Sequence, residues 1–145
     1  MTILHADLIA RRVRGLWLGV LIEGPAGAGK SDLALRALRR GFRLVADDRV
    51  LVFLSDGRLY GRAPEALAGL FEVRGLGVIP HDYLPFARIA LKVTCAPSPA
   101  GVDRAPEAET ATILGIATPT LAIWPFEVSA PVKLTAMLEH LGAGA

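Results

Sequence analysis

A glycine-rich segment in the first third of the chain holds the residues best suited to chemistry. It fits the pattern G-x-x-x-x-G-K-[ST] and reads Gly24-Pro25-Ala26-Gly27-Ala28-Gly29-Lys30-Ser31. Glycines let the backbone turn tightly, so successive N–H groups and the positive end of the following helix dipole face bound phosphates. Lys30 then neutralises the β- and γ-phosphates, and the Ser31 hydroxyl binds Mg²⁺. The segment predicts a site for ATP and Mg²⁺, with a glycine turn that binds nothing as the weaker alternative.

Two adjacent acids, Asp47 and Asp48, follow the next apolar segment. Ligands of parallel sheets lie beyond the carboxyl ends of the strands, so we expect this pair beside the phosphates. One carboxylate would lie near Mg²⁺ or its water, and the other would accept a proton from an acceptor hydroxyl. A polar turn after a strand is the alternative.

A second glycine-rich segment, residues 72–77, carries Glu72 and Arg74. It is predicted to be a loop. A glutamate in such a loop is a fair Mg²⁺ ligand, but a surface ion pair between the two side chains explains them equally well.

The elements that must position these residues alternate between strand and helix. Strands are predicted over residues 17–22 and 42–46, and a helix over residues 31–40 that ends at Gly41. Residues 50–54 and 59–62 predict a hairpin, and Pro64 opens a short helix whose Leu67, Leu70 and Phe71 face the core. Further along, the sequence predicts strands over 88–93, 112–114 and 121–124, a long mobile loop over 96–109, and a helix over 131–141 ended by Gly142.

Composition limits the class of protein. The chain has 145 residues, 52% of them hydrophobic and 21% charged, which fits one globular domain over residues 1–145. No secretion signal or membrane span is visible, and the single cysteine, Cys95, suits a reducing cytoplasm. A net charge of +2 with 6% aromatic residues argues against nucleic acid as a partner.

Four motifs together closely resemble the catalytic domain of the HPr kinase/phosphorylase family. They are the segment 24–31, Leu44-Val45-Ala46-Asp47-Asp48-Arg49-Val50, Gly61-x-Ala63-Pro64-Glu65 and Glu72-Val73-Arg74-Gly75-Leu76-Gly77-Val78-Ile79. The match is continuous from about residue 19 to residue 80. The chain is similar to the short form found in α-proteobacteria, which lacks the family's N-terminal domain. The resemblance implies an α/β P-loop kinase fold of the HPr kinase/PEP carboxykinase-like type, a mixed sheet with flanking helices.

The resemblance also implies roles for individual residues. Residues 24–31 would bind ATP, with Lys30 at the phosphates, and Ser31 and Glu72 would hold Mg²⁺. Asp48, beside Asp47, matches the family's proton acceptor. His5 resembles an active-site histidine that precedes the phosphate loop, although residues 11–17 add length between them. Arg104 resembles an active-site arginine on a loop that closes over the site.

The activity that the resemblance implies is transfer of the γ-phosphoryl of ATP to a serine of a small HPr-like phosphocarrier, within a phosphotransferase or phosphorelay pathway that regulates carbon metabolism. The family pattern continues from Ala130-Pro131-Val132-Lys133 with Gly-Arg-Asn, which Leu134-Thr135-Ala136 replaces here. We therefore expect weak phosphorylase activity. The family is hexameric, so the hypothesis that this chain forms a homo-oligomer stays open. Two other hypotheses also stay open: a small-molecule kinase, and a non-catalytic ATP-responsive module that binds a two-component or phosphotransferase protein.

Overall fold

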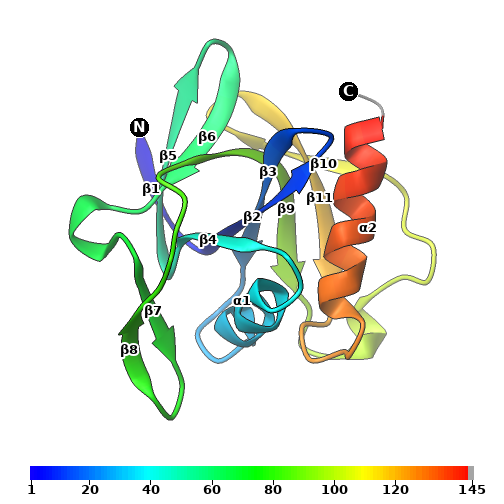
Figure 1. Cartoon of the computed structure of the whole chain (residues 1–145). Helices are drawn as coiled ribbons and strands as arrows, with labels where there is room; N and C mark the ends of the chain where they lie inside the picture. The colour runs from blue at the N-terminus through cyan, green and yellow to red at the C-terminus, as the bar shows by residue number, and fades with distance from the viewer. Residues whose placement is uncertain (144–145) are drawn as a thin grey trace.

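The structure is a computed structural model, and it describes residues 1–143. Over these residues, nine strands form one curled mixed sheet and two form a separate hairpin (Figure 1). The predicted domain extends to residue 145, so its last residues, 144 and 145, lie outside the described part. The strands of the large sheet are β1 (Thr2–His5), β2 (Asp7–Val13), β3 (Leu16–Glu23), β4 (Arg43–Ala46), β5 (Arg49–Ser55), β6 (Arg58–Arg62), β9 (Ala87–Cys95), β10 (Glu109–Ile113) and β11 (Ile116–Ile123). The hairpin is β7 (Leu70–Val73) and β8 (Gly77–Pro80).

Strand directions decide where the site lies. β3 is parallel to β9, which is parallel to β11, whereas β2 is antiparallel to both β3 and β4. β4 therefore runs in the same direction as β3, although β2 separates them. The carboxyl ends of β3, β4, β9 and β11 consequently share one edge of the sheet, where ligands of α/β folds bind.

Apolar residues fill both faces of the sheet, as the continuous apolar run of β3 predicts. Val20 and Ile22 point to the face covered by α1 (Lys30–Leu38) and α2 (Ala130–Ala143), which lie side by side in Figure 1. Leu21 points to the opposite face, into a second cluster that contains Leu8 and Val52. The central strands are thus buried on both sides and hold their carboxyl ends rigidly.

The two predicted long helices exist, but only the first ends as expected. α1 ends near Gly41, which has φ 91°, and the N–H of Phe42 donates to the carbonyl of Ala37. The prediction that Gly142 ends the last helix is wrong, because α2 continues through it. A Cβ at Gly142 would lie 2.8 Å from Cγ1 of Val13, so the glycine allows close packing of α2 on β2.

The segment after Pro64 differs most from its prediction. The expected helix is a single 3₁₀ turn, Glu65–Leu67, and Leu67 is exposed. Phe71 is buried as expected, but it lies on strand β7. The predicted loop over residues 72–77 is correct only for the turn at residues 74–76, because Glu72 pairs with Val78 and Val73 with Gly77 in the β7–β8 hairpin. Hydrogen bonds between these strands pair backbone groups that we expected, from the glycine content, to lie in an irregular loop.

Strands β1 and β2 were not predicted, because residues 2–13 mix charged and apolar side chains. The predicted hairpin over residues 50–62 is confirmed as β5 and β6, and the predicted strands over 112–114 and 121–124 are longer, as β10 and β11. The segment 96–108 has only one 3₁₀ turn, Pro99–Gly101. No helix described within residues 1–143 combines the length and apolar character that a membrane crossing requires.

We predict that Leu134→Ala lowers the free energy of unfolding by about 2–5 kcal/mol, because Leu134 is fully buried between α2 and the sheet. Urea denaturation measures the change. Val132→Ala on the same helix is the control, since that side chain is 51% exposed and should cost little. Equal losses in both variants would contradict the packing of α2 described here.

Candidate functional site

A pocket of about 390 Å³ opens at the edge where the carboxyl ends of the strands meet. The sequence-predicted site residues that line it are His5, Ala26, Gly27, Gly29, Lys30, Ser31, Asp48 and Glu72. The other predicted residues do not line the pocket. Gly24, Pro25 and Ala28 belong to the loop, and Asp47 accepts a supporting hydrogen bond from the N–H of Glu72. Elements that are far apart in the sequence thus meet around one cavity.

The loop between β3 and α1 has the backbone shape that phosphate binding needs. Gly27 and Gly29 have φ values of 82° and 103°, which L side chains rarely adopt. A Cβ at Gly29 would also lie 2.9 Å from both Phe126 and Pro125. The loop runs directly into the N-terminus of α1, where unpaired N–H groups and the helix dipole favour an anion.

Lys30 is held at the base of this loop. Its side chain is only 7% exposed, and its ammonium donates to the carbonyl oxygens of Gly24 at 2.6 Å and Pro25 at 3.4 Å. An ammonium has three N–H donors, so these two contacts leave one for an anion in the pocket. The arrangement is a positive charge already fixed beside the loop amides.

Two carboxylates surround the Ser31 hydroxyl. Oδ2 of Asp7 and Oδ1 of Asp47 each lie 3.4 Å from Oγ of Ser31. Asp7 is completely buried, and its other oxygen accepts the backbone N–H of Asp48 at 2.8 Å. Burial, followed by the negative charge of Asp47, raises the pKa of Asp7 from its ordinary 3.8 to about 8, while Lys30 opposes the rise.

The network continues to the other predicted Mg²⁺ ligand. The second oxygen of Asp47 accepts the backbone N–H of Glu72 at 2.8 Å, which fixes the start of the β7–β8 hairpin against the site. The Glu72 side chain is exposed and lines the pocket. Among the described residues no ion pair joins Glu72 to Arg74, and both line the cavity, which favours the site interpretation over a surface ion pair.

Asp48 occupies a strained turn. Its φ is 65°, and the N–H of Arg49 donates to the carbonyl of Asp47 at 2.7 Å across it, as in a γ-turn of the rare positive-φ kind. Nε2 of His5 donates to Oδ1 of Asp48 at 2.5 Å, although both side chains are about half exposed. The added length over residues 11–17 does not displace His5, because β2 and β3 absorb it as a hairpin.

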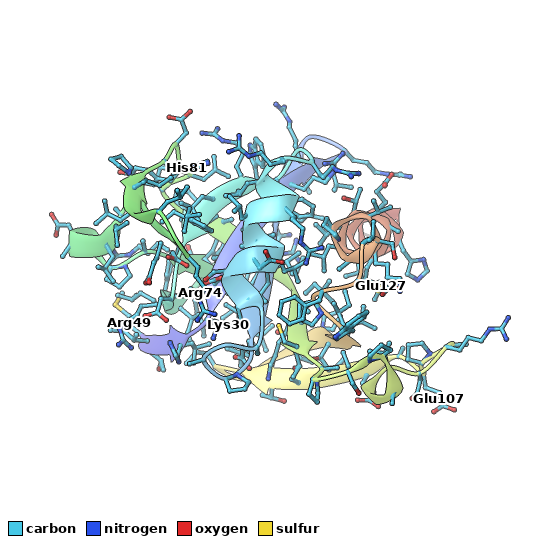
Figure 2. All side chains as sticks on the ribbon, turned by 90° about the horizontal axis from the view of Figure 1, so that it is seen from below. Lys30, Arg49, Arg74, His81, Glu107 and Glu127 are labelled. Carbon is cyan, nitrogen blue, oxygen red and sulfur yellow. The ribbon has the colours of Figure 1, made fainter. Side chains whose placement is uncertain are left out.

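Arg104 lies elsewhere. It is exposed and is not among the residues that line the pocket, and its loop neighbour Glu107 stands far from Lys30 at the side of the molecule (Figure 2). Arg74 on the β7–β8 turn is the arginine at the pocket. The loop-borne role that the family resemblance implies for Arg104 stays a prediction.

Sequence reasoning missed Asp7. The one available signal was a single carboxylate within the otherwise apolar run Ala6-Asp7-Leu8-Ile9-Ala10. Acids are almost never fully buried without partners, so such a residue in a strand deserves suspicion.

The donor set suits Mg²⁺. Ser31 and Glu72, the two predicted ligands, line the pocket and offer only oxygen atoms, which this hard cation prefers. Within the described residues no three acidic, histidine or cysteine side chains form a ready metal cage. Cys95 lies in the apolar core, where burial raises the pKa of its thiol to about 11.

The fold and the loop define a P-loop α/β domain. Comparison with known proteins identifies the family: the pattern of the "HPr Serine kinase C-terminal domain" matches residues 2–84, more than half of the chain. The chain belongs to this family. The match reaches residue 2 and so includes His5 and Asp7.

Relatives and a solved structure agree with this assignment. The HPr kinase/phosphorylase of Limosilactobacillus reuteri (strain DSM 20016) is 40% identical over 127 residues, covering 80% of this chain and 38% of the relative. That of Clostridium beijerinckii is 52% identical over 62 residues, covering 43% and 20%. The Hpr(Ser) kinase/phosphatase of Coxiella burnetii superposes with a TM-score of 0.80 at 25% identity, covering 97% of this chain and 90% of that one. The predicted α/β fold of this family is therefore confirmed, and the chain spans about two fifths or less of the curated relatives' length.

We predict that Asp7→Asn flattens the pH dependence of stability in magnesium-free buffer. The folded-state pKa of Asp7 is raised from 3.8 to about 8, so the folded protein binds a proton that the unfolded chain releases. The free energy of unfolding should therefore fall as pH rises through that window, on the order of a few kcal/mol. Asparagine carries no charge and still accepts the N–H of Asp48.

Chemical denaturation of both proteins at several pH values measures the effect. Asp56→Asn, in the exposed β5–β6 turn, is the matched control and should keep the wild-type profile. If the free energy of unfolding of Asp7→Asn fell with pH as steeply as that of the wild type, the pKa of Asp7 would not be raised in the folded protein.

Proposed function

We propose that this domain transfers the γ-phosphoryl group of ATP to a serine of a small HPr-type phosphocarrier protein. One observation carries the proposal: the phosphate-binding loop with Lys30 and the His5–Asp48 pair open into the same pocket. A phosphate-binding loop alone fits any nucleotide-binding domain. A carboxylate beside that loop can accept the proton of a hydroxyl during phosphoryl transfer.

The proposed reaction uses Asp48 as the proton acceptor. His5 donates to one oxygen of Asp48, which leaves the other oxygen to take the proton of the serine hydroxyl. The serine oxygen bonds to the γ-phosphorus as the bond from that phosphorus to ADP breaks, giving phosphoserine and ADP. Lys30 and the loop amides stabilise negative charge on the phosphates. Mg²⁺, when held by Ser31 and Glu72, would neutralise further phosphate charge.

We propose that dephosphorylation of the partner is weak. The segment where the family pattern has Gly-Arg-Asn begins here with Leu134, which is buried in the core. Lys133 before it forms an ion pair with Glu127 at 2.6 Å. The arginine and asparagine of the family pattern are replaced here by Thr135 and Ala136, neither of which carries a charge.

We predict that Lys30→Ala abolishes ATP binding or weakens it severely. The variant removes the buried ammonium that neutralises the phosphates and also frees the carbonyls of Gly24 and Pro25. Isothermal calorimetry measures the loss. Lys92→Ala, which removes the same charge from a β9 residue paired with Glu23, should bind as the wild type does. Unchanged affinity in Lys30→Ala would refute the nucleotide site.

We predict that Asp48→Asn slows phosphoryl transfer at least ~100-fold while Mg-ATP binding stays within a few-fold of wild type. Asparagine tolerates the positive φ of this position and still accepts from His5, so the fold should survive. It cannot accept a proton from the serine hydroxyl. Single-turnover transfer at saturating ATP and phosphocarrier, beside a binding isotherm, separates the two effects.

The double variant Asp47→Asn/Asp48→Asn tests whether Asp47 substitutes as the base. Undiminished transfer after both changes would exclude Asp48 from proton transfer. A wild-type protein that binds ATP and transfers phosphate to no protein would replace the kinase proposal with the regulatory-module alternative.

A further inference from the structure

The pocket is lined by side chains of different chemistry. His5, Asp48 and Glu72 are among its polar side chains, and His5 pairs with Asp48. Phe126 is an aromatic side chain that lines the pocket on the side of the phosphate-binding loop and α1. It lies in the segment between β11 and α2 and is 52% exposed, so much of the ring stays accessible.

The backbone that carries this ring is held in place. Arg36 of α1 donates to the carbonyl oxygens of Pro125 and of Glu127, the residues on either side of Phe126. The same guanidinium pairs with Asp32 at 3.0 Å. The β11–α2 segment is thereby tied to the helix that follows the phosphate-binding loop.

Phe126 also packs directly on that loop. Its Cζ would lie 2.9 Å from a Cβ at Gly29, so the absence of a side chain there leaves room for the ring. Figure 2 shows Glu127, the next residue, on the opposite side of α1 from Arg74 of the β7–β8 turn. Phe126 therefore contacts the loop from the β11–α2 segment, whereas Glu72 and Arg74 line the pocket from the β7–β8 hairpin.

The direction of a bound nucleotide follows from this arrangement. The γ-phosphate must lie toward Asp48, where the acceptor hydroxyl would be activated, and Lys30 fixes the phosphates at the loop. The α-phosphate and the nucleoside must then leave the loop away from the acids. Of the two aromatic rings that line the pocket, Phe126 is the accessible one, since Phe71 is buried.

We propose that Phe126 is the stacking platform for the nucleobase of the bound nucleoside triphosphate. This inference rests on the proposed function and deepens it by locating the base. Bases stack on aromatic side chains through their π-faces, and such a contact adds affinity without reading the base edge. The exposed face of a ring fixed by Arg36 is preorganised for this, so little ordering is needed on binding.

The test compares a complete nucleotide with its phosphate part alone. Calorimetry gives the affinities of Mg-ATP and of Mg-tripolyphosphate for the wild type and for Phe126→Ala, with circular dichroism as the check on folding. Phe126→Ala should weaken Mg-ATP roughly 10- to 100-fold. Mg-tripolyphosphate, which has no base, should bind within about 2-fold of wild type.

Three further variants sharpen the comparison. Phe126→Leu keeps apolar bulk against Gly29 and loses the aromatic face, so it should still weaken Mg-ATP at least about 5-fold, whereas Phe126→Trp should restore it. Val128→Ala is the matched control, because Val128 lies in the same segment, is 88% exposed and does not line the pocket.

Three outcomes would overturn the proposal. Unchanged Mg-ATP affinity in Phe126→Ala and Phe126→Leu would leave the ring as an exposed contact for another protein. Equal weakening of both ligands would show that Phe126 only supports the phosphate-binding loop. A wild type that binds tripolyphosphate as tightly as ATP has no base site. Separately, a wild type that binds neither ligand would refute the proposed function itself.

Discussion

The site depends on two carboxylates that share one hydroxyl. Asp7 and Asp47 both approach Oγ of Ser31, and each uses its second oxygen to hold a backbone N–H from another part of the site. Asp7 holds the strained turn at Asp48, and Asp47 holds the hairpin at Glu72. Placing like charges together in a buried setting is costly unless cations compensate. Lys30 is the resident cation, and the oxygen-rich surroundings suit a divalent ion as well.

The fold makes this convergence possible through strand direction. β2 lies between β3 and β4 and runs against both, so Asp7 at its start reaches the same edge as the phosphate-binding loop and the Asp47–Asp48 turn at the other strands' ends. Because both faces of these strands are buried, Asp7, the phosphate-binding loop and the Asp47–Asp48 turn keep fixed positions relative to one another. β11 reaches that edge as well, which brings Phe126 to the loop.

Local patterns predicted the parts of the site that lie within one segment. The residues of the phosphate-binding loop and the Asp47–Asp48 pair stand out because each motif is contiguous. Asp7 and Phe126 could not be found in this way, because their importance comes from contacts with residues distant in the chain. The β7–β8 hairpin was mistaken for a loop because glycines outweighed the strand-forming residues around them. Gly142 was mistaken for a helix end because close packing against Val13 cannot be read from one element.

The central claim is that this domain phosphorylates a serine of an HPr-type phosphocarrier, and labelled phosphate transfer tests it most directly. The protein would be incubated with magnesium, γ-labelled ATP and purified HPr, and the labelled residue would be mapped by mass spectrometry. We expect label on one serine of HPr, with ADP formed in equal amount. No label in HPr under conditions where the domain binds ATP, or label on a histidine, would contradict it.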